Sequence, residues 1–143
     1  MTTDIAIDRL GEVANRNPGL LHRGRYLDTS FLLEVGARSW IVRIHQGRVE
    51  AVVPGPFVMP RWDFALRASE HEWSMFWQEL PPPGHHDLMA MIKRRALRLE
   101  GDVRPFMGNL FYFKALLASL RPSGRLDSVA PLATVMDAVE AGR

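Results

Sequence analysis

Residues 62–120 of this 143-residue chain read WDFALRASEHEWSMFWQELPPPGHHDLMAMIKRRALRLEGDVRPFMGNLFYFKALLASL. Hydrophobic periodicity and turn residues predict, in order, a strand at 62–68, an aromatic helix at 70–79, a break at 81–84, a Met-rich helix at 86–95, a short strand at 97–100, a turn at 101–102 and a long apolar helix at 103–120. Nearly all the apolar residues in this segment are large, and no motif in it has a catalytic pattern. The segment therefore predicts a shared apolar interior rather than a reaction centre.

Local signals mark where these helices begin. Ser69 is followed three residues later by Glu72, which is the spacing of a capping box. Asp102 is expected to cap the last helix, and Pro105 falls in its first turn, where a missing N–H does little harm. In the aromatic helix, one wide apolar stripe is predicted at the spacing i, i+3, i+4 and i+7, formed by Trp73, Phe76, Trp77 and Leu80.

The residues before this segment predict one helix and a β-meander. Helical spacing favours a helix at 4–15, and Asn17-Pro18-Gly19 is expected to end it. Alternating apolar residues then predict antiparallel strands near 31–35, 40–45 and 49–53, joined by turns that contain glycine. Together with the strand ending at Ala68 and the short strand at 97–100, these elements predict an α+β fold.

Length and composition favour one domain with its own core. We assign the domain to 1–121, followed by a linker and a short amphipathic helix in 122–143, with its apolar stripe at Leu132, Val135, Met136 and Val139. The chain has no cysteine, which excludes disulfides and thiolate metal sites. No signal peptide and no apolar run of ~18 residues is present, so we expect a cytoplasmic protein.

The formal net charge is only +2, and the basic residues do not form a large patch. One basic run occurs, Lys93-Arg94-Arg95, at the predicted end of a helix, where cations are favourable. A nucleic-acid surface needs a broader basic patch with aromatic residues among the cations. We therefore expect no nucleic-acid partner.

Motifs for catalysis are weak. The glycines do not form a phosphate-binding loop, and there is no nucleophile elbow. The cluster with the most catalytic character is His85-His86-Asp87, but adjacent histidines point in different directions on a helix. Solvated histidines, with Asp87 in the first turn of the following helix, are the favoured interpretation. We accordingly expect a non-enzymatic protein, with no catalytic residue, metal ligand or cofactor assigned.

The abundance of large apolar residues has two possible interpretations. They can fill a well-packed core, which is the ordinary case. Met and aromatic side chains also suit an adaptable apolar cavity, because Met repacks easily and aromatic rings offer a large contact area. Composition does not separate these two possibilities.

The order of elements resembles the sterol carrier protein type 2 (SCP2) family of sterol-binding domains. The resemblance is carried by the meander at 31–53, by FALRASEHEWSMFW at 64–77 and by ALRLEGDVRPFMGNLFYFKALLASL at 96–120, with Gly101-Asp102 as a nearly fixed point. It covers about residues 5–120. The chain departs from the family pattern at 54–63, which is bulkier, and at 81–86, which is unusually rich in proline and histidine.

The resemblance implies a five-stranded, largely antiparallel sheet backed by about five helices. It further implies an apolar tunnel that holds a fatty acyl chain, a sterol or a similar lipid, with no catalysis. Carried over by position, the tunnel wall would consist of Trp73, Phe76, Trp77, Met89, Ile92, Phe106, Leu110, Phe113 and Leu117. Both departures from the family pattern flank the expected mouth of this tunnel.

Two alternatives stay open at this point. In the first, the chain is an accessory or interaction module that supports lipid or lipid-quinone metabolism, with the stripe at 132–139 docking onto a partner or a second copy. Alternatively, it is a small enzyme for an apolar substrate, with His85, His86, Asp87 or Asp63 at a cavity mouth. The partner expected in the favoured case is an apolar small molecule; transient membrane contact is a further possibility, and monomer and homodimer are both open.

Overall fold

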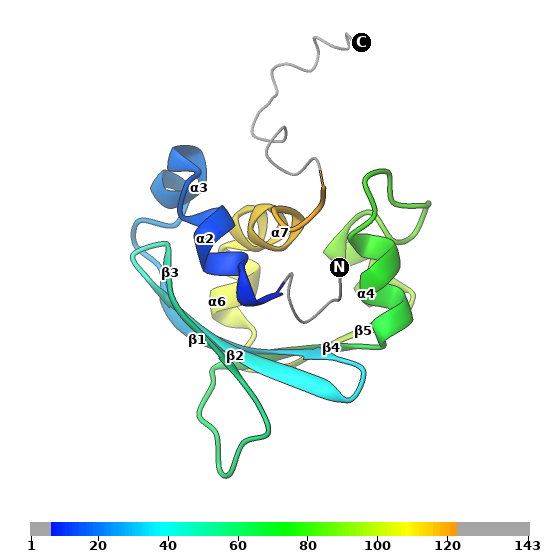
Figure 1. Cartoon of the computed structure of the whole chain (residues 1–143), viewed down its shortest axis with the longest axis horizontal. Coiled ribbons are helices and arrows are strands. Elements are labelled where there is room, and N and C mark those ends of the chain that lie inside the picture. Colours follow the sequence, from blue (N-terminus) through cyan, green and yellow to red (C-terminus); the bar gives the residue numbers. More distant parts are fainter. Residues whose placement is uncertain (1–6, 123–143) are drawn as a thin grey trace, which may run out of the picture.

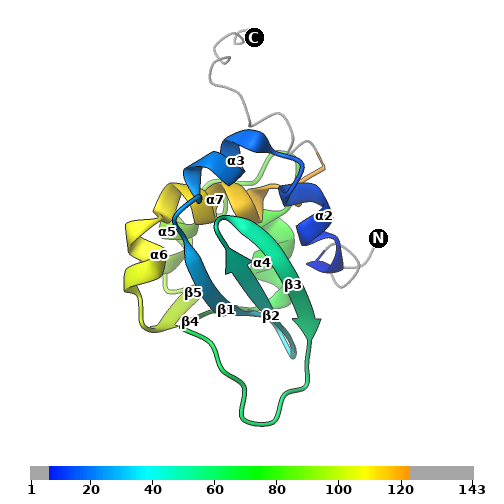
Figure 2. The same ribbon diagram turned by 90° about the vertical axis from the view of Figure 1, so that its left-hand side faces the viewer.

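The computed structural model describes residues 7–122 of the protein and shows a sheet with helices on one side (Figure 1). The elements in chain order are α2 (Leu10–Ala14), α3 (Pro18–Arg23), β1 (Asp28–Val35), β2 (Arg38–His45), β3 (Arg48–Pro54), β4 (Phe64–Ala68), α4 (Glu70–Phe76), α5 (Leu88–Lys93), β5 (Leu97–Gly101), α6 (Arg104–Gly108) and α7 (Leu110–Ala118). The loop between β3 and β4 extends away from the helices in both views (Figures 1 and 2).

The five strands form a single sheet in the order β3-β2-β1-β4-β5. The pairs β1–β2, β2–β3 and β4–β5 are antiparallel, whereas β1 and β4 run parallel at the centre. The predicted α+β class and largely antiparallel sheet are therefore confirmed. The parallel pair arises because β4 returns to the free side of β1 after the meander is complete.

Alternation along the strands separates the two faces of the sheet. On β1, Phe31 and Leu33 point into the helix-covered core, and the register places them beside Phe64 and Leu66 of β4. The residue between those on β4 is Ala65, which lies on the other face of the sheet. The apolar rows on the helix side are the floor on which α6 and α7 pack.

The N-terminal region differs from the prediction. Asn17-Pro18 does not only end a helix but also begins α3: the Asn17 Oδ1 accepts a hydrogen bond from the Leu20 N–H at 3.2 Å, and Pro18 occupies the first turn. The predicted helix at 4–15 is described only from residue 7, and its regular part is the short α2. An Asn-Pro pair is an N-terminal signal as well as a stop signal.

The predicted helix at 103–120 is two helices. It breaks at Asn109, whose backbone angles are −130° and 38°, directly after Gly108. The Asn109 side chain donates a hydrogen bond to the Pro105 carbonyl at 2.9 Å, which satisfies an acceptor at the end of α6. Asp102 is not the N-cap either: Val103 holds that position, and Asp102 accepts from the Arg104 N–H at 3.2 Å.

Smaller corrections concern the middle helices. α4 ends at Phe76 instead of continuing to residue 79, and Leu80 is 85% exposed, so it does not extend the aromatic stripe. On α5 the fully buried methionine is Met91, whereas Met89 and Ile92 are half-buried. The predicted stripe at 132–139 lies outside the described residues.

One contact fixes α7 against the sheet. The buried Tyr112 hydroxyl donates a hydrogen bond to the Gly47 carbonyl in the β2–β3 turn at 2.7 Å. Burial raises the pKa of the Tyr112 hydroxyl above its ordinary value. Gly24, at the end of α3, passes the same ring so closely that a Cβ built there would lie 2.5 Å from the ring carbon Cε1. Three distant segments therefore meet around one aromatic ring.

Candidate ligand-binding site

The nine predicted wall residues belong to one apolar interior between the helices and the sheet. Five are fully buried: Trp73, Phe76, Phe106, Phe113 and Leu117. Four are half-buried and pack against the same core: Trp77, Met89, Ile92 and Leu110. The structure therefore brings all nine into one region.

A cluster of aromatic rings fills the interior next to the centre of the sheet. The Phe113 ring lies 5.6 Å from Phe31, 5.3 Å from Phe64, 5.6 Å from Phe106 and 5.2 Å from Tyr112, measured between centroids. Three of these four pairs are close to perpendicular, which is a favourable geometry for aromatic rings. Phe31, Phe64 and Tyr112 were not predicted as members of this region, because only the strand register and the helix break bring them to Phe113.

The aromatic residues of α4 form a second cluster. Trp73 stacks on Trp77 at 5.1 Å and meets Phe76 edge-on at 5.6 Å. Both indole N–H groups have partners, since Trp73 donates to the Glu34 carbonyl at 2.8 Å and Trp77 donates to the Leu117 carbonyl at 2.9 Å. These bonds connect α4 to β1 on one side and to α7 on the other.

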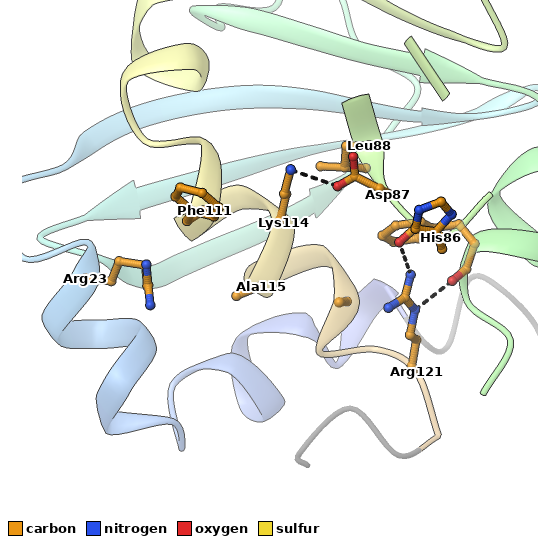
Figure 3. A pocket seen from close by; sticks show the side chains of 10 residues that line it. Arg23, His86, Asp87, Leu88, Phe111, Lys114, Ala115 and Arg121 are labelled. Atoms are coloured by element: carbon orange, nitrogen blue, oxygen red, sulfur yellow. Dashed lines mark hydrogen bonds and ion pairs between the residues drawn. The ribbon is translucent and has the colours of Figure 1, made fainter. Parts of the chain in front are cut away.

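A groove of about 300 Å³ opens beside this second cluster (Figure 3). Its lining comes from α3, from the end of α4, from the start of α5 and from one side of α7: Arg23, Phe76, His86, Asp87, Leu88, Phe111, Lys114, Ala115, Ala118 and Arg121. Phe76 and Leu88 are buried, so they separate the groove from the core. The α7 side of the groove was not predicted, although Phe111, Ala115 and Ala118 follow helical spacing.

The rim of the groove is largely cationic. Arg121 donates hydrogen bonds to the carbonyls of Phe76 at 2.8 Å and His86 at 2.9 Å, and its guanidinium lies 4.4 Å from the Phe76 ring centroid. Lys114 forms an ion pair with Asp87 at 2.9 Å. These contacts hold the chain before α5 against α7 and the residues that follow it.

A larger groove of about 520 Å³ lies between the open face of the sheet and the loop after β3. Its apolar lining includes Leu32, Phe57 and Trp62, and its polar lining includes Glu34 and Arg67, which form an ion pair. None of the nine predicted wall residues lines this second groove. The groove beside Phe76 is therefore the candidate site.

The His85-His86-Asp87 cluster separates in space. His85 is not solvated as predicted: its side chain is 17% exposed and its Nδ1 lies 3.0 Å from a Glu72 carboxylate oxygen. His86 is exposed, and Asp87 stands at the N-cap position of α5, where its carboxylate pairs with Lys114 instead of a backbone N–H. Asp63 lies elsewhere and accepts a hydrogen bond from the Thr29 hydroxyl at 2.6 Å.

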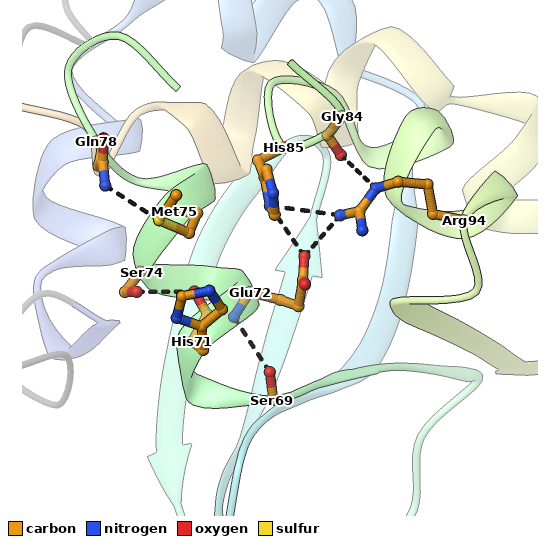
Figure 4. Close-up of polar contacts among 9 residues, drawn as sticks. All are labelled: Ser69, His71, Glu72, Ser74, Met75, Gln78, Gly84, His85 and Arg94. Atoms are coloured by element: carbon orange, nitrogen blue, oxygen red, sulfur yellow. Dashed lines mark hydrogen bonds and ion pairs between the residues drawn. The ribbon is translucent and has the colours of Figure 1, made fainter. Parts of the chain in front are cut away.

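Glu72 connects α4 to the residues before and after α5 (Figure 4). The predicted cap is confirmed, because the Ser69 hydroxyl accepts a hydrogen bond from the Glu72 N–H at 3.1 Å. The Glu72 carboxylate does not complete a capping box but accepts from Arg94 at 2.7 Å. Arg94 also donates to the Gly84 carbonyl at 3.0 Å, so this network secures the proline-rich loop.

This network predicts an acid-dependent contribution to stability. Burial raises the pKa of the Glu72 carboxyl, but the hydrogen bond and charge of Arg94, followed by His85, outweigh burial and lower that pKa below its usual 4.5. A lowered folded-state pKa stabilises the fold above the unfolded-state value, and this stabilisation is lost as the pH falls through the folded-state pKa. Arg94→Gln is therefore expected to lower the melting temperature near neutral pH and to have less effect in acid.

Thermal unfolding followed by circular dichroism from about pH 3 to about pH 7 checks this expectation. Arg61→Gln, at an exposed loop position, is the control and is expected to change the curve little at any pH. A deficit in Arg94→Gln that stays constant across the pH range would contradict the assigned role of Glu72.

Within residues 7–122, no three histidine or acidic side chains come close enough together to hold a metal ion. No helix in the same range is long and apolar enough to cross a membrane.

Comparison with known proteins gives matches in structure only. No family model matches the sequence, and no curated protein matches it. A crystal structure of sterol carrier protein 2 matches with a TM-score of 0.68 and 12% identity, over 82% of this chain and 95% of that chain. UbiJ-SCP2, a ubiquinone synthesis protein, matches with a TM-score of 0.52 and 20% identity, over 78% of this chain and 89% of that chain.

The stereoselective inverting sec-alkylsulfatase Pisa1 from Pseudomonas sp. also matches, with a TM-score of 0.54 and 14% identity. That match covers 78% of this chain but only 16% of the sulfatase. The likenesses show that the chain has an SCP2-like fold, as the sequence resemblance implied.

Proposed function

Starting from the SCP2-like fold, we propose that this protein binds a lipid or other apolar small molecule, such as a fatty acyl chain or a sterol-like compound, and carries it without changing it chemically. The observation that supports the proposal is the groove of about 300 Å³ whose floor is formed by Phe76 and Leu88. Both side chains also belong to the hydrophobic core. An apolar guest in this groove lies directly against the interior that contains the nine predicted wall residues.

Such a guest needs few polar contacts. Burying one CH₂ group stabilises a complex by ~0.8 kcal/mol, so an acyl chain binds through its length alone. The guest reaches the interior by displacing Phe76. The half-buried Met89 side chain of the same core then repacks, because a flexible thioether tolerates rearrangement. The nine residues become the walls of a tunnel in this occupied state.

The groove lining favours carrying over catalysis. None of its ten residues has a hydroxyl or thiol side chain. Asp87 is held by Lys114 at 2.9 Å, and the His86 carbonyl accepts from Arg121 at 2.9 Å. His86 and Asp87 nevertheless border the groove, so the same test includes a search for turnover of the bound compound.

A second role, in lipid-quinone metabolism, is favoured by the likeness to UbiJ-SCP2, a ubiquinone synthesis protein. In that role the same groove would hold the isoprenoid tail of a quinone. Competition between a fluorescent fatty acid and a ubiquinone therefore distinguishes the two guests.

The test begins with the full chain purified gently from cells and analysed by native mass spectrometry, where an added lipid mass is expected. Fluorescent fatty-acid binding is then compared with that of Ala118→Phe, which places a ring in the groove. At least about tenfold weaker binding is expected, because a filled groove removes burial of several CH₂ groups. Ala115→Phe, at a more exposed position of the same groove, serves if Ala118→Phe fails to fold.

Ala37→Phe is the matched control, since Ala37 is exposed and lines the groove on the open face of the sheet. Its binding is expected to equal that of the unchanged chain. Absence of a lipid mass together with absence of probe binding would disprove the proposal. A loss in Ala37→Phe alone would move the site to the other groove, and release of a chemically altered compound would make the protein an enzyme.

A further inference from the structure

The face of the sheet opposite the helices has an apolar centre that the loop between β3 and β4 helps to cover. Leu32 of β1 points to this outer face, because its neighbours Phe31 and Leu33 point into the core, yet it is only 5% exposed. The described helices lie on the other face (Figure 1). A groove of about 520 Å³, here called the outer groove, lies over Leu32, and its lining includes Leu32, Glu34, Ser39, Phe57, Trp62 and Arg67.

Two aromatic rings of the loop stand on opposite sides of β1. Phe57 lies against Gly55, where a Cβ would be 3.0 Å from its Cε2, and the Gly55 N–H donates to the Ser39 carbonyl of β2 at 2.8 Å. Trp62 lies against Gly101 at the end of β5, where a Cβ would be 3.0 Å from its Cζ3. Because β1 lies between β2 and β5 in the sheet, the two rings form the walls of the outer groove and Leu32 its floor.

The polar end of the outer groove has a fixed guanidinium. Arg67 of β4 donates hydrogen bonds through Nε to Glu100 of β5 at 2.8 Å and through Nη1 to Glu34 of β1, and its guanidinium carbon lies 5.8 Å from the Trp62 ring centroid. Among residues 7–122, Arg67 Nη2 has no acceptor and Glu34 Oε2 has no donor. The groove therefore offers an N–H donor beside a carboxylate acceptor.

The charges at this end favour an uncharged ligand. Two carboxylates balance Arg67, so a ligand anion placed beside its guanidinium would also approach Glu34 and Glu100. Arg38 lines the groove as well, with its guanidinium carbon 5.9 Å from the Trp40 ring centroid. A neutral group that both accepts and donates a hydrogen bond uses Arg67 and Glu34 without that repulsion.

We propose that the outer groove is a second ligand site, which binds a flat, uncharged aromatic carboxamide. The aromatic ring stacks on Trp62 or Phe57, the amide oxygen accepts from Arg67, and the amide N–H donates to Glu34. This site goes beyond the lipid binding proposed above, because it lies on the opposite face of the sheet from the groove beside Phe76.

The lining of the outer groove suits such a compound better than it suits a lipid. An acyl chain would take Glu34, Ser39 and Arg67 out of water without supplying hydrogen bonds in return, which is unfavourable. Aromatic walls give a flat ring a large contact area instead. The volume of about 520 Å³ also falls in the range that is usual for small-molecule sites.

The test is an NMR titration of the isotope-labelled full chain with nicotinamide, a flat carboxamide. The indole N–H signal of Trp62 is expected to shift until it saturates, whereas those of Trp73 and Trp77 stay in place because their N–H groups are hydrogen-bonded to backbone carbonyls. Nicotinate carries a carboxylate on the same ring. It is expected to bind at least about fivefold more weakly, because of Glu34 and Glu100.

Variants of the two walls test the stacking. Trp62→Leu, which also identifies the indole signal by its loss, and Phe57→Leu are each expected to weaken nicotinamide binding about tenfold. In Trp62→Leu the shifts are followed at backbone N–H signals of β1 and β4. Tyr26→Leu is the matched control, because Tyr26 is aromatic and 87% exposed but lines neither groove, so no change is expected. Circular dichroism confirms folding, and Phe57→Leu serves alone if Trp62→Leu does not fold.

A pair of filling variants separates this site from the lipid site. Ala37→Phe in the outer groove is expected to weaken nicotinamide binding and not fatty-acid binding, and Ala118→Phe is expected to do the reverse. Absence of a saturable Trp62 shift, nicotinate binding as tight as nicotinamide, or equal losses in Ala37→Phe and Ala118→Phe would overturn the proposal. Failure of fatty-acid binding alone would disprove lipid carrying and leave the outer site standing.

Discussion

Phe113→Ala is expected to lower the free energy of unfolding by about 3–5 kcal/mol, the usual loss when a fully buried Phe is truncated. Phe113 is 0% exposed and is the ring that contacts Phe31, Phe64, Phe106 and Tyr112. Truncation removes the transfer free energy of the ring and leaves a void that four rigid neighbours cannot close. Urea unfolding followed by circular dichroism measures the change.

Phe111→Ala is the matched control, two residues away on the same helix but 66% exposed. Its cost is expected to stay within about 0.5 kcal/mol, as for most exposed positions. If Phe113→Ala does not fold, Phe113→Leu is the milder variant and is expected to remain folded at a smaller cost. Equal costs for Phe113→Ala and Phe111→Ala would contradict the packing described for α7.

Gly47→Ala is expected to cost at least about 2 kcal/mol, because two independent penalties add. The Gly47 φ angle is +83°, a region in which side chains are strained. A Cβ there would also lie 2.8 Å from the Gly24 carbonyl carbon, which is backbone and cannot swing aside. The change would push the β2–β3 turn away from α3 and weaken the Tyr112 hydrogen bond to the Gly47 carbonyl.

Gly108→Ala is expected to have the opposite effect on the free energy of unfolding, measured in the same way. Gly108 is the last residue of α6, and a Cβ there would meet nothing within 4 Å. Alanine is expected to stabilise the fold by up to about 1 kcal/mol through its better helix propensity. A destabilised Gly108→Ala, or a neutral Gly47→Ala, would show that these two backbone positions are placed incorrectly.

The successful predictions rest on local patterns. Alternation predicted the strands, and the Ser69 cap was confirmed because a cap depends on residues three apart. The errors have non-local or competing causes. The break at Asn109 depends on its side chain, which donates a hydrogen bond to the Pro105 carbonyl. The apolar pattern is continuous across this position, so it predicted a single helix.

The candidate site was predictable only in part, for a similar reason. Periodicity identified α4 and α7 as apolar, and all nine proposed wall residues do pack in the core. Which side of α7 borders a groove is decided by where α3 and the residues before α5 come to lie. Arg23 and Arg121, separated by most of the chain, line the same groove only because of the fold.

Phe76 belongs both to the hydrophobic core and to the lining of the candidate groove, and these two roles conflict. Its ring packs on Trp73 and Trp77 inside the protein, and the same ring forms part of the floor of the groove that a guest would occupy. Any free energy that holds the ring inward stabilises the empty protein and opposes entry of the guest. Affinity for cargo and resistance to unfolding therefore cannot be optimised independently at this position.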